Sequence, residues 1–323
     1  MPATLYTFKG IDNYGDVTVS DQLKANFVDF LNWGFLEIGA FVNVTIPTTT
    51  LVGGEGPHKL RAVRDPNFTN GRVWESQRMN WVYESGISYG IQPISVSGIY
   101  VNGTFYPGAS TGTYAHIVDY RNGRIIFNTA IATSSSITCE YSYKLVNVVD
   151  VDSNVFKTIQ ADSFNSLDSN IPVSSGEWSK QAQSRTQLPC IGIDVVPEVD
   201  FTPKQLGGGQ YKHQTIAFHV MAENSSTRNK LCDIITSQKD RTLMLYDMNK
   251  VADANSFALT SSGNLNSGGV NNYRNKLLPV ASGGYQWKLC EIERAKAIGL
   301  NTSNSKNSYG LVYLTLKVDM PEI

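Results

Sequence analysis

One pattern in the sequence is associated with nucleophilic catalysis. Residues 108–112 read GASTG and fit the GxSxG motif of serine hydrolases. In those enzymes the serine lies on a sharp turn between a strand and a helix, so that its hydroxyl projects above a sheet. Here a turn-rich loop is followed by the strand-like segment Tyr114 to Tyr120, which does not fit that arrangement. A hydrolase is therefore the third hypothesis for this chain, and it depends on Ser110 alone.

Residue types that bind metals, phosphates or cofactors are present but scattered. The glycine run at 207–209 lacks the Lys-Ser/Thr pair that completes a phosphate-binding loop. None of the four histidines has the i, i+4 spacing of a helical metal pair, and the four cysteines form no CxxC pair. The acidic residues between Asp194 and Asp247 form no paired arrangement suited to acid–base catalysis. We therefore expect no catalytic residue, no metal and no cofactor, and four buried free thiols.

A segment rich in arginine and aromatic residues is typical of a binding surface. Trp, Tyr and Arg are enriched in the central, energetically important part of protein interfaces. The predicted protein-interface residues are Arg61, Arg64, Trp74, Arg78 and Trp81. The alternative is that the aromatic residues of this segment fill a local core, and the sequence leaves both interpretations open.

The charge balance excludes several classes of partner. The chain of 323 residues has 27 Lys and Arg against 28 Asp and Glu, and only 17% of its residues are charged. Sequence-specific nucleic-acid binding draws on clustered basic residues, which are absent from this pattern. No window approaches the about 20 apolar residues that cross a membrane, and no secretory signal precedes the first elements. A net charge of -1 also gives little electrostatic repulsion between copies, which favours self-association.

The N-terminal region, residues 1–92, is expected to contain one clear helix. Ser20 and Asp21 form a capping pair in front of apolar residues at helical spacing, among them Leu23 and Phe27. The alternating segment Gly39 to Ile46 predicts a strand, and a glycine-rich loop follows it. The arginine and aromatic segment completes this region.

Residues 93–150 are expected to form a small antiparallel β module, because the apolar residues here alternate with a period of two. Asn122-Gly123 predicts a tight two-residue hairpin turn, in which both residues have positive φ. A further turn is expected at Asn102-Gly103. The predicted strands are Ile94 to Val101, Ala115 to Tyr120, Arg124 to Asn128 and Ile137 to Val148.

Residues 151–323 are expected to form an antiparallel sheet with a helix packed on one face. The helix is predicted to begin near Asn224 and to end near Lys239. Residues 260–275 are polar and glycine-rich, which predicts a long exposed loop that lies against other protein. The predicted strands are Cys190 to Val196, Gln214 to Ala222, Thr242 to Tyr246, Gln286 to Ile292 and Tyr309 to Val318. The fold class expected for the whole chain is therefore α+β and β-rich.

Three segments carry a resemblance to proteins of bacteriophage particles. Ser97 to Pro107 and His116 to Phe127 look like segments of structural proteins of contractile and other tailed bacteriophages. Leu188 to Lys250 is similar, in its layout of strands and helix, to the tail-terminator and neck proteins that cap a tail or join it to the head. That resemblance implies an oligomeric ring without catalytic residues.

The leading hypothesis is a non-enzymatic structural protein of the head–tail joint: a neck, collar or tail-terminator-like protein. Its expected partners are copies of itself in a ring and other neck and tail proteins, and its expected location is the virion, assembled in the host cytoplasm. The alternative is a carbohydrate- or receptor-binding virion module. In that alternative, the side chains that would stack on sugars are Trp74, Trp81, Tyr83 and Trp178.

Overall fold

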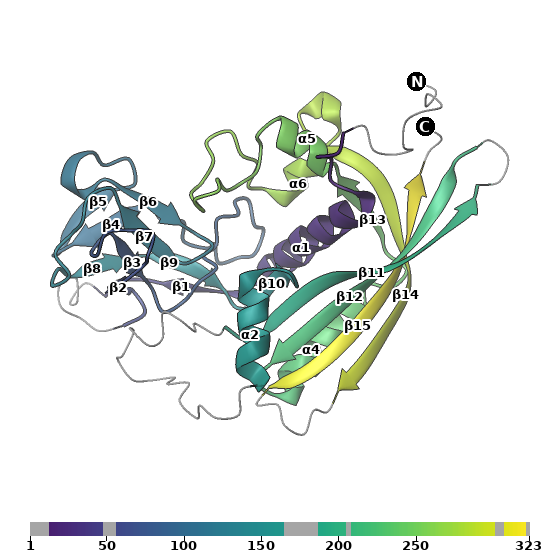
Figure 1. The fold of residues 1–323 in the computed structure, drawn as a ribbon, viewed down its shortest axis with the longest axis horizontal. Coiled ribbons are helices and arrows are strands. Elements are labelled where there is room, and N and C mark those ends of the chain that lie inside the picture. The colour runs from purple at the N-terminus through teal and green to yellow at the C-terminus, as the bar shows by residue number, and fades with distance from the viewer. Residues whose placement is uncertain (1–12, 48–55, 165–186, 205–207, 301–306, 321–323) are drawn as a thin grey trace.

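A computed structural model describes residues 13–47, 56–164, 187–204, 208–300 and 307–320, and Figure 1 shows the fold. Strands contain 38% of the residues and helices 20%, which confirms the expected β-rich α+β class. The strands form one sheet of six, one sheet of seven and a two-stranded pair. No helix within the described ranges is both long and apolar enough to cross a membrane.

The six-stranded sheet has the strand order β10-β11-β12-β15-β14-β13, and its four central strands are long. All neighbouring strands are antiparallel except β10 and β11, which are parallel. Each strand predicted after residue 151 lies in this sheet, and four of them extend beyond their predicted ends. The strands are β10 (Asn147–Asp150), β11 (Cys190–Pro203), β12 (Gln210–Ala222), β13 (Thr242–Tyr246), β14 (Gln286–Leu300) and β15 (Ser308–Met320).

One face of this sheet is buried under two helices, α1 (Val19–Glu37) and α4 (Ser225–Thr236). Every second residue of β15 from Gly310 to Val318 is buried, because alternate side chains of a strand point to opposite faces. Phe27 of α1 meets Phe218 of β12 edge to face, with ring centroids 6.0 Å apart. The two helices and the sheet therefore share one hydrophobic core, as the predicted helix on a sheet required.

The helix starts are set by local caps. The Thr18 hydroxyl accepts a hydrogen bond from the Asp21 backbone N–H at 3.2 Å, so α1 is capped ahead of the expected Ser20-Asp21 pair. Asn224 caps α4 as predicted, because its Oδ1 accepts from the Thr227 N–H at 2.9 Å. Both helices thus begin at a side chain that satisfies an otherwise free backbone donor.

The opposite face of the six-stranded sheet is covered at one end by α2 (Asn154–Phe164). Phe156 of α2 packs in a cluster with Cys190 of β11 and Met221 of β12. At Gly192 of β11 a Cβ atom would overlap the Phe156 ring, so glycine lets this helix approach the sheet closely.

The seven-stranded sheet has the order β5-β4-β8-β2-β3-β7-β6 and encloses a second core. The two-stranded pair of β1 (Phe41–Val44) and β9 (Tyr141–Lys144) lies where the chain enters and leaves this unit. The seven strands are β2 (Lys59–Val63), β3 (Val73–Glu75), β4 (Gly98–Val101), β5 (Thr104–Pro107), β6 (His116–Asp119), β7 (Arg124–Phe127) and β8 (Ile137–Cys139).

The expected division into residues 1–92, 93–150 and 151–323 is wrong at both boundaries. The boundary after residue 92 crosses the seven-stranded sheet, because β2 pairs with β8 and β3 pairs with β7. The other boundary fails because β10 and α1 belong to the six-stranded sheet and its core. The seven-stranded unit is thus an insertion, about residues 41–145, between α1 and β10, and Figure 1 shows the two units side by side.

The tight hairpin turn lies at Asn102-Gly103. Asn102 and Gly103 have φ of 49° and 84°, and the strands on either side, β4 and β5, pair immediately before and after them. A two-residue turn with two positive φ angles matches the right-handed twist of the strands that it joins. This turn therefore has the geometry that the sequence analysis expected at Asn122-Gly123.

The predicted hairpin at Asn122-Gly123 exists, but its two-residue turn is wrong. Asp119 pairs with Arg124, which leaves residues 120–123 as a four-residue loop. Tyr120 leaves the ladder because its ring, only 1% exposed, packs in the core, while its N–H donates to the Gly263 carbonyl at 3.0 Å.

The polar loop at 260–275 is not a free extension, which corrects the prediction. The Asn271 side chain donates to the Tyr83 carbonyl at 3.3 Å and accepts from the Ser85 hydroxyl at 2.8 Å. Leu259, just before it, is buried in the core of the seven-stranded unit. The loop lies against its own chain, and exposed residues such as Ser261 and Ser267 lie along it.

Four short helical elements complete the fold. Three lie near the polar loop, and the fourth, η2, lies in the seven-stranded unit. They are α5 (Met248–Asp253), α6 (Tyr273–Lys276), η3 (Val280–Ser282) and η2 (Gly112–Tyr114).

The core beneath the helices can be tested at Phe218. Replacing it with Ala removes a fully buried ring that meets Phe27, and we expect the free energy of unfolding to fall by about 3–5 kcal/mol. The control is Phe105→Ala, at a ring that is 44% exposed, where we expect a change below about 1 kcal/mol. Urea denaturation followed by circular dichroism measures both; equal losses would contradict the packing described here.

Candidate functional site

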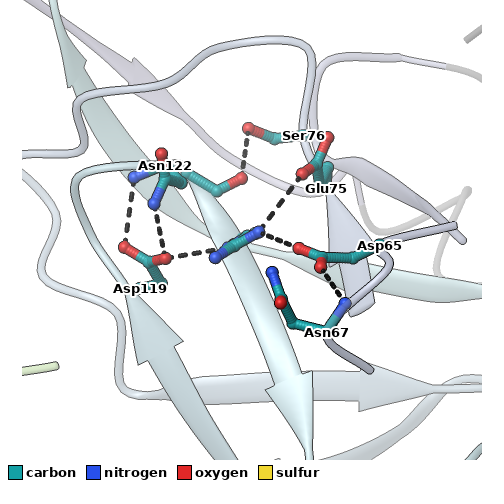
Figure 2. A network of polar contacts seen from close by, with 8 residues as sticks. Asp65, Asn67, Glu75, Ser76, Asp119 and Asn122 are labelled. Carbon is teal, nitrogen blue, oxygen red and sulfur yellow. Dashed lines mark hydrogen bonds and ion pairs between the residues drawn. The ribbon is translucent and has the colours of Figure 1, made fainter. Parts of the chain in front are cut away.

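A partly buried ionic network lies in the seven-stranded unit, and Figure 2 shows it. The Arg124 Nε donates to Asp119 Oδ2 at 2.8 Å. Its Nη1 donates to Asp65 Oδ2 at 2.9 Å and lies 3.9 Å from Glu75 Oε1. One guanidinium therefore faces three carboxylates from different parts of the chain.

The strand ladder places these residues. Arg124 stands opposite Asp119 across β6 and β7, and opposite Glu75 across β3 and β7. Asp65 follows the end of β2 and also accepts from the Asn67 N–H at 2.8 Å. In Figure 2 Asp65 and Glu75 lie close to each other, and Asp119 lies across from them. The register thus brings residues 75 and 119 beside Arg124, and Asp65 reaches the same guanidinium from the loop that follows β2.

The electrostatics of the network favour a structural role. Burial lowers the pKa of Arg124, but the hydrogen bond and charge of Asp119, the charge of Glu75 and the hydrogen bond to Asp65 outweigh it, so the net shift of this pKa is upward. The Asp119 side chain is only 3% exposed and also accepts from the Asn122 N–H at 3.2 Å. A permanently charged guanidinium that faces all three carboxylates holds together the segments that carry them.

A cavity of about 990 Å³ adjoins the network. Arg61, Arg64 and Trp74, three of the five predicted interface residues, line it together with Arg124. Val155 and Ile159 of α2 form another part of its wall. The structure thus gathers part of the predicted set around one hollow and leaves Arg78 and Trp81 outside it.

Trp74 and Trp81 do not offer aromatic faces to a partner, which corrects the interface prediction for these two residues. Trp74 is 2% exposed, and its Nε1–H donates to the Gly71 carbonyl at 2.9 Å. Trp81 is fully buried and stacks on Tyr141 with ring centroids 4.3 Å apart. Both rings belong to the core of the seven-stranded unit, which is the local-core alternative.

The three arginines of the predicted set lie nearer the surface. Arg64 is exposed just beyond the end of β2, and Arg61 is half-buried within that strand. The Arg78 guanidinium lies over the Tyr143 ring, 5.1 Å from its centroid. Of the five predicted interface residues, Arg64 is therefore the most accessible to a partner.

The residues proposed to stack on sugars are mostly unavailable. Trp74 and Trp81 are buried, and the Lys144 ammonium lies over the half-buried Tyr83 ring at 4.8 Å from its centroid. Trp178 lies outside the described residues. The aromatic evidence for a carbohydrate-binding module is therefore lost at Trp74 and Trp81, the two proposed tryptophans that lie among the described residues.

The remaining chemical motifs do not assemble into a site. Ser110 lies in a loop between β5 and the three-residue helix η2, and β6 follows, so the strand–turn–helix context of a GxSxG serine is missing there. Of the glycine run 207–209, Gly207 lies outside the described residues. Across the described ranges, no three His, Cys, Asp or Glu side chains are grouped to hold a metal ion.

The cysteines are four buried free thiols, as predicted. Burial raises the pKa of Cys190 and of Cys290 to about 12, and it also raises the pKa of Cys139 and Cys232. A thiol that stays protonated is a weak nucleophile, so these groups behave as apolar core atoms.

A second ionic cluster connects α1 with the C-terminal half of the chain. Asp29 of α1 accepts hydrogen bonds from the Lys276 ammonium at 2.7 Å and from the Tyr246 hydroxyl at 2.8 Å. Lys144 and Glu84 form a nearby buried pair at 2.6 Å. These groups line or adjoin a cavity of about 600 Å³ between the two units. The cluster therefore joins α1 to the segment that follows the polar loop.

Neither ionic cluster was predicted from the sequence. The expected two-residue turn at Asn122-Gly123 places Arg121 opposite Arg124, and only the observed four-residue loop brings Asp119 there. No local signal connects Asp65 or Glu75 to that hairpin, since they lie on other strands. Asp29 and Lys276 are 247 positions apart, so only the tertiary fold brings them together.

The sequence matches no protein-family model and no curated protein.

The Arg124 network can be tested by removing its cation. Arg124→Met leaves Asp119 buried without its partner, and we expect the free energy of unfolding to fall by about 3–5 kcal/mol. The control is Arg274→Met, which breaks the ion pair between Arg274 and Glu37. The Arg274 side chain is 57% exposed, so we expect the free energy of unfolding to fall by only about 0–1 kcal/mol. Urea denaturation measures both; an Arg124→Met loss as small as the control would show that the network adds no stability.

The second cluster predicts a pH effect. Burial alone raises the pKa of Asp29, but Lys276 and Tyr246 outweigh it and hold that pKa below its ordinary value of 3.8. A carboxylate with a lowered pKa in the folded state stabilises the fold above its ordinary pKa, and this contribution is lost as the pH falls through the lowered value.

We therefore expect Asp29→Asn to be less stable than the wild type at neutral pH, with the difference shrinking as the pH falls below 3.8. Urea midpoints across that pH range measure it. The control is Asp253→Asn, at an exposed position at the end of α5, where we expect no such trend. A difference that stays constant with pH would contradict the assignment.

Proposed function

We propose that this chain is a non-enzymatic structural protein of the bacteriophage head–tail joint, a neck, collar or tail-terminator-like protein that assembles into an oligomeric ring. The observation that carries the proposal is the order of elements after residue 188. The order β11, β12, α4, β13 is the strand, strand, helix, strand layout for which Leu188 to Lys250 resembles tail-terminator and neck proteins. The helix packs on one face of the resulting sheet.

The surface composition supports self-association. With a net charge of -1 and 17% charged residues, copies of the chain repel each other weakly. The structure also relocates the contacts that the sequence analysis assigned to neighbours, because the polar loop and both tryptophans pack within the chain. In this proposal the contacts between copies in the ring are made by the sheets and by the exposed Arg64, and not by the polar loop or the two tryptophans.

The charged clusters are compatible with a structural protein. Arg124 and its carboxylates hold loops together, and Asp29 with Lys276 joins α1 to the rest of the fold. In this proposal the partners are further copies of the chain and other neck and tail proteins, and the site of action is the virion, assembled in the host cytoplasm.

The test is the assembly state and the location of the protein. Sedimentation velocity over a concentration series and negative-stain electron microscopy of the purified chain should reveal closed rings of one size. Immunogold labelling of particles of the encoding phage, with antibody against the chain, should mark the junction of head and tail. A chain that stays monomeric at every concentration and is missing from purified particles would contradict the proposal.

A further inference from the structure

The two outer long strands of the six-stranded sheet are each covered along only part of their length. β10 pairs with residues 190–193 of β11, and β13 pairs with β14 between Gln286 and Glu291. Within the described residues, β11 from Asp194 onward and β14 from Glu293 onward have a neighbouring strand on one side only. The sheet thus has two free edges, at opposite sides and opposite ends.

The free edges differ in shape on the face that carries α1 and α4. Val199 and Phe201 of β11 point to this face, since they pair with the buried residues Gln214 and Lys212, and they are 39% and 51% exposed. The corresponding residues of the β14 edge are small, Ala295 and Ala297. One edge therefore presents bulky apolar side chains, and the other leaves room for them.

The edges also differ in charge on the opposite face. Asp200 of β11 points to that face, and Arg294 and Lys296 of β14 point to it as well. Asp200, Arg294 and Lys296 have no ion-pair partner among the described residues. Opposite charges directly across two strands attract, whereas like charges there are destabilising. Pairing of unlike edges is therefore favoured over pairing of two identical edges.

The strand directions permit that pairing. β14 runs antiparallel to β15, β15 antiparallel to β12, and β12 antiparallel to β11, so β14 and β11 run in opposite directions. A second copy in the same orientation therefore places its β11 antiparallel to β14 of the first. The two edges lie at opposite ends of the sheet, so each copy is staggered along the strands relative to the one before it. In β-barrels, a stagger between strands together with their tilt is what closes the sheet.

Prolines limit the length of the contact. Pro197 and Pro203 have no N–H to donate, and the ladder between β11 and β12 is irregular between Val195 and Val199. The part of the β11 edge that contains no proline or irregularity is therefore residues 199–202. There the Phe201 N–H donates to Asp200 Oδ1 at 2.8 Å, and pairing with another strand exchanges this bond for one to a carbonyl and releases the carboxylate.

We propose that neighbouring copies of this chain join by pairing β14 of one copy with β11 of the next, in a head-to-tail contact that rests on the proposed ring function. In this register Asp200 stands opposite Lys296, and Phe201 stands opposite Ala295. Val199 then faces Ala297, and Thr202 faces Arg294. Each copy offers both edges, so the contact is heterologous and repeats around a ring.

The first test exchanges the central charges. Lys296→Asp and Asp200→Lys each place like charges opposite each other in every contact, and we expect each to weaken self-association about fivefold or more. Lys296→Asp with Asp200→Lys in one chain restores the attraction, and so does mixing the two single variants. Lys239→Asp, at a lysine that is 55% exposed on neither edge, is the matched control and should leave association unchanged. Sedimentation velocity measures all five samples.

The second test reads the register. Phe201→Cys with Ala295→Cys in one chain should form disulfides between copies on mild oxidation, visible as a ladder on a non-reducing gel. The four native cysteines are buried and do not compete. Thr202→Cys with Ala295→Cys is the control, because residue 202 points to the opposite face and should not cross-link. Circular dichroism verifies that every variant is folded.

The outcomes separate this inference from the proposed function. A wild-type chain that is monomeric at every concentration overturns both. A wild-type ring that tolerates each single charge variant and gives no cross-link between residues 201 and 295 overturns the edge pairing and leaves the ring function standing. Loss of assembly in the single variants, with recovery in the exchanged chain, supports the pairing.

Discussion

The packing of α1 on the six-stranded sheet is the contact on which the rest of the structure depends. Phe27 meets Phe218, a residue 191 positions later by their numbering, so the core exists only when these two distant parts of the chain have met. The intervening residues must leave this core and return to it. The pair of β1 and β9 lies where the chain leaves the core and where it returns, and β10 then joins the six-stranded sheet directly. The seven-stranded unit is therefore an insertion that the larger sheet holds in place.

Polar residues stabilise this arrangement from within. The ionic clusters around Arg124 and Asp29 each connect segments that are far apart in sequence, and the polar loop hydrogen-bonds to the seven-stranded unit. Uncharged polar side chains can be buried at such a contact with less desolvation cost than charges. The low charge of the chain thus partly reflects internal contacts between its two units, in addition to any contact with neighbours.

The sequence predicted what depends on neighbouring residues and missed what depends on distant ones. The strand Thr242–Tyr246 and the cap of α4 at Asn224 follow from local pattern, and both are as expected. The pairing of β2 and β3 with later strands has no local signal, so the first domain boundary was misplaced. For the same reason, composition could not tell that Trp74 and Trp81 face a core, since the residue types favoured at interfaces also fill interiors.

The incomplete cover of the six-stranded sheet is itself a consequence of strand length. β10 and β13 have four and five residues, whereas the strands that they flank have 14 and 15, so part of each outer strand must lack a neighbour. Proteins commonly protect such edges with charges, prolines and bulges, and this sheet has all three. Here Asp200 on one edge and Arg294 and Lys296 on the other have opposite charge, and the prolines leave one short uninterrupted segment. The charges and prolines that hinder pairing between two identical edges therefore also select one register in which the β11 edge fits the β14 edge.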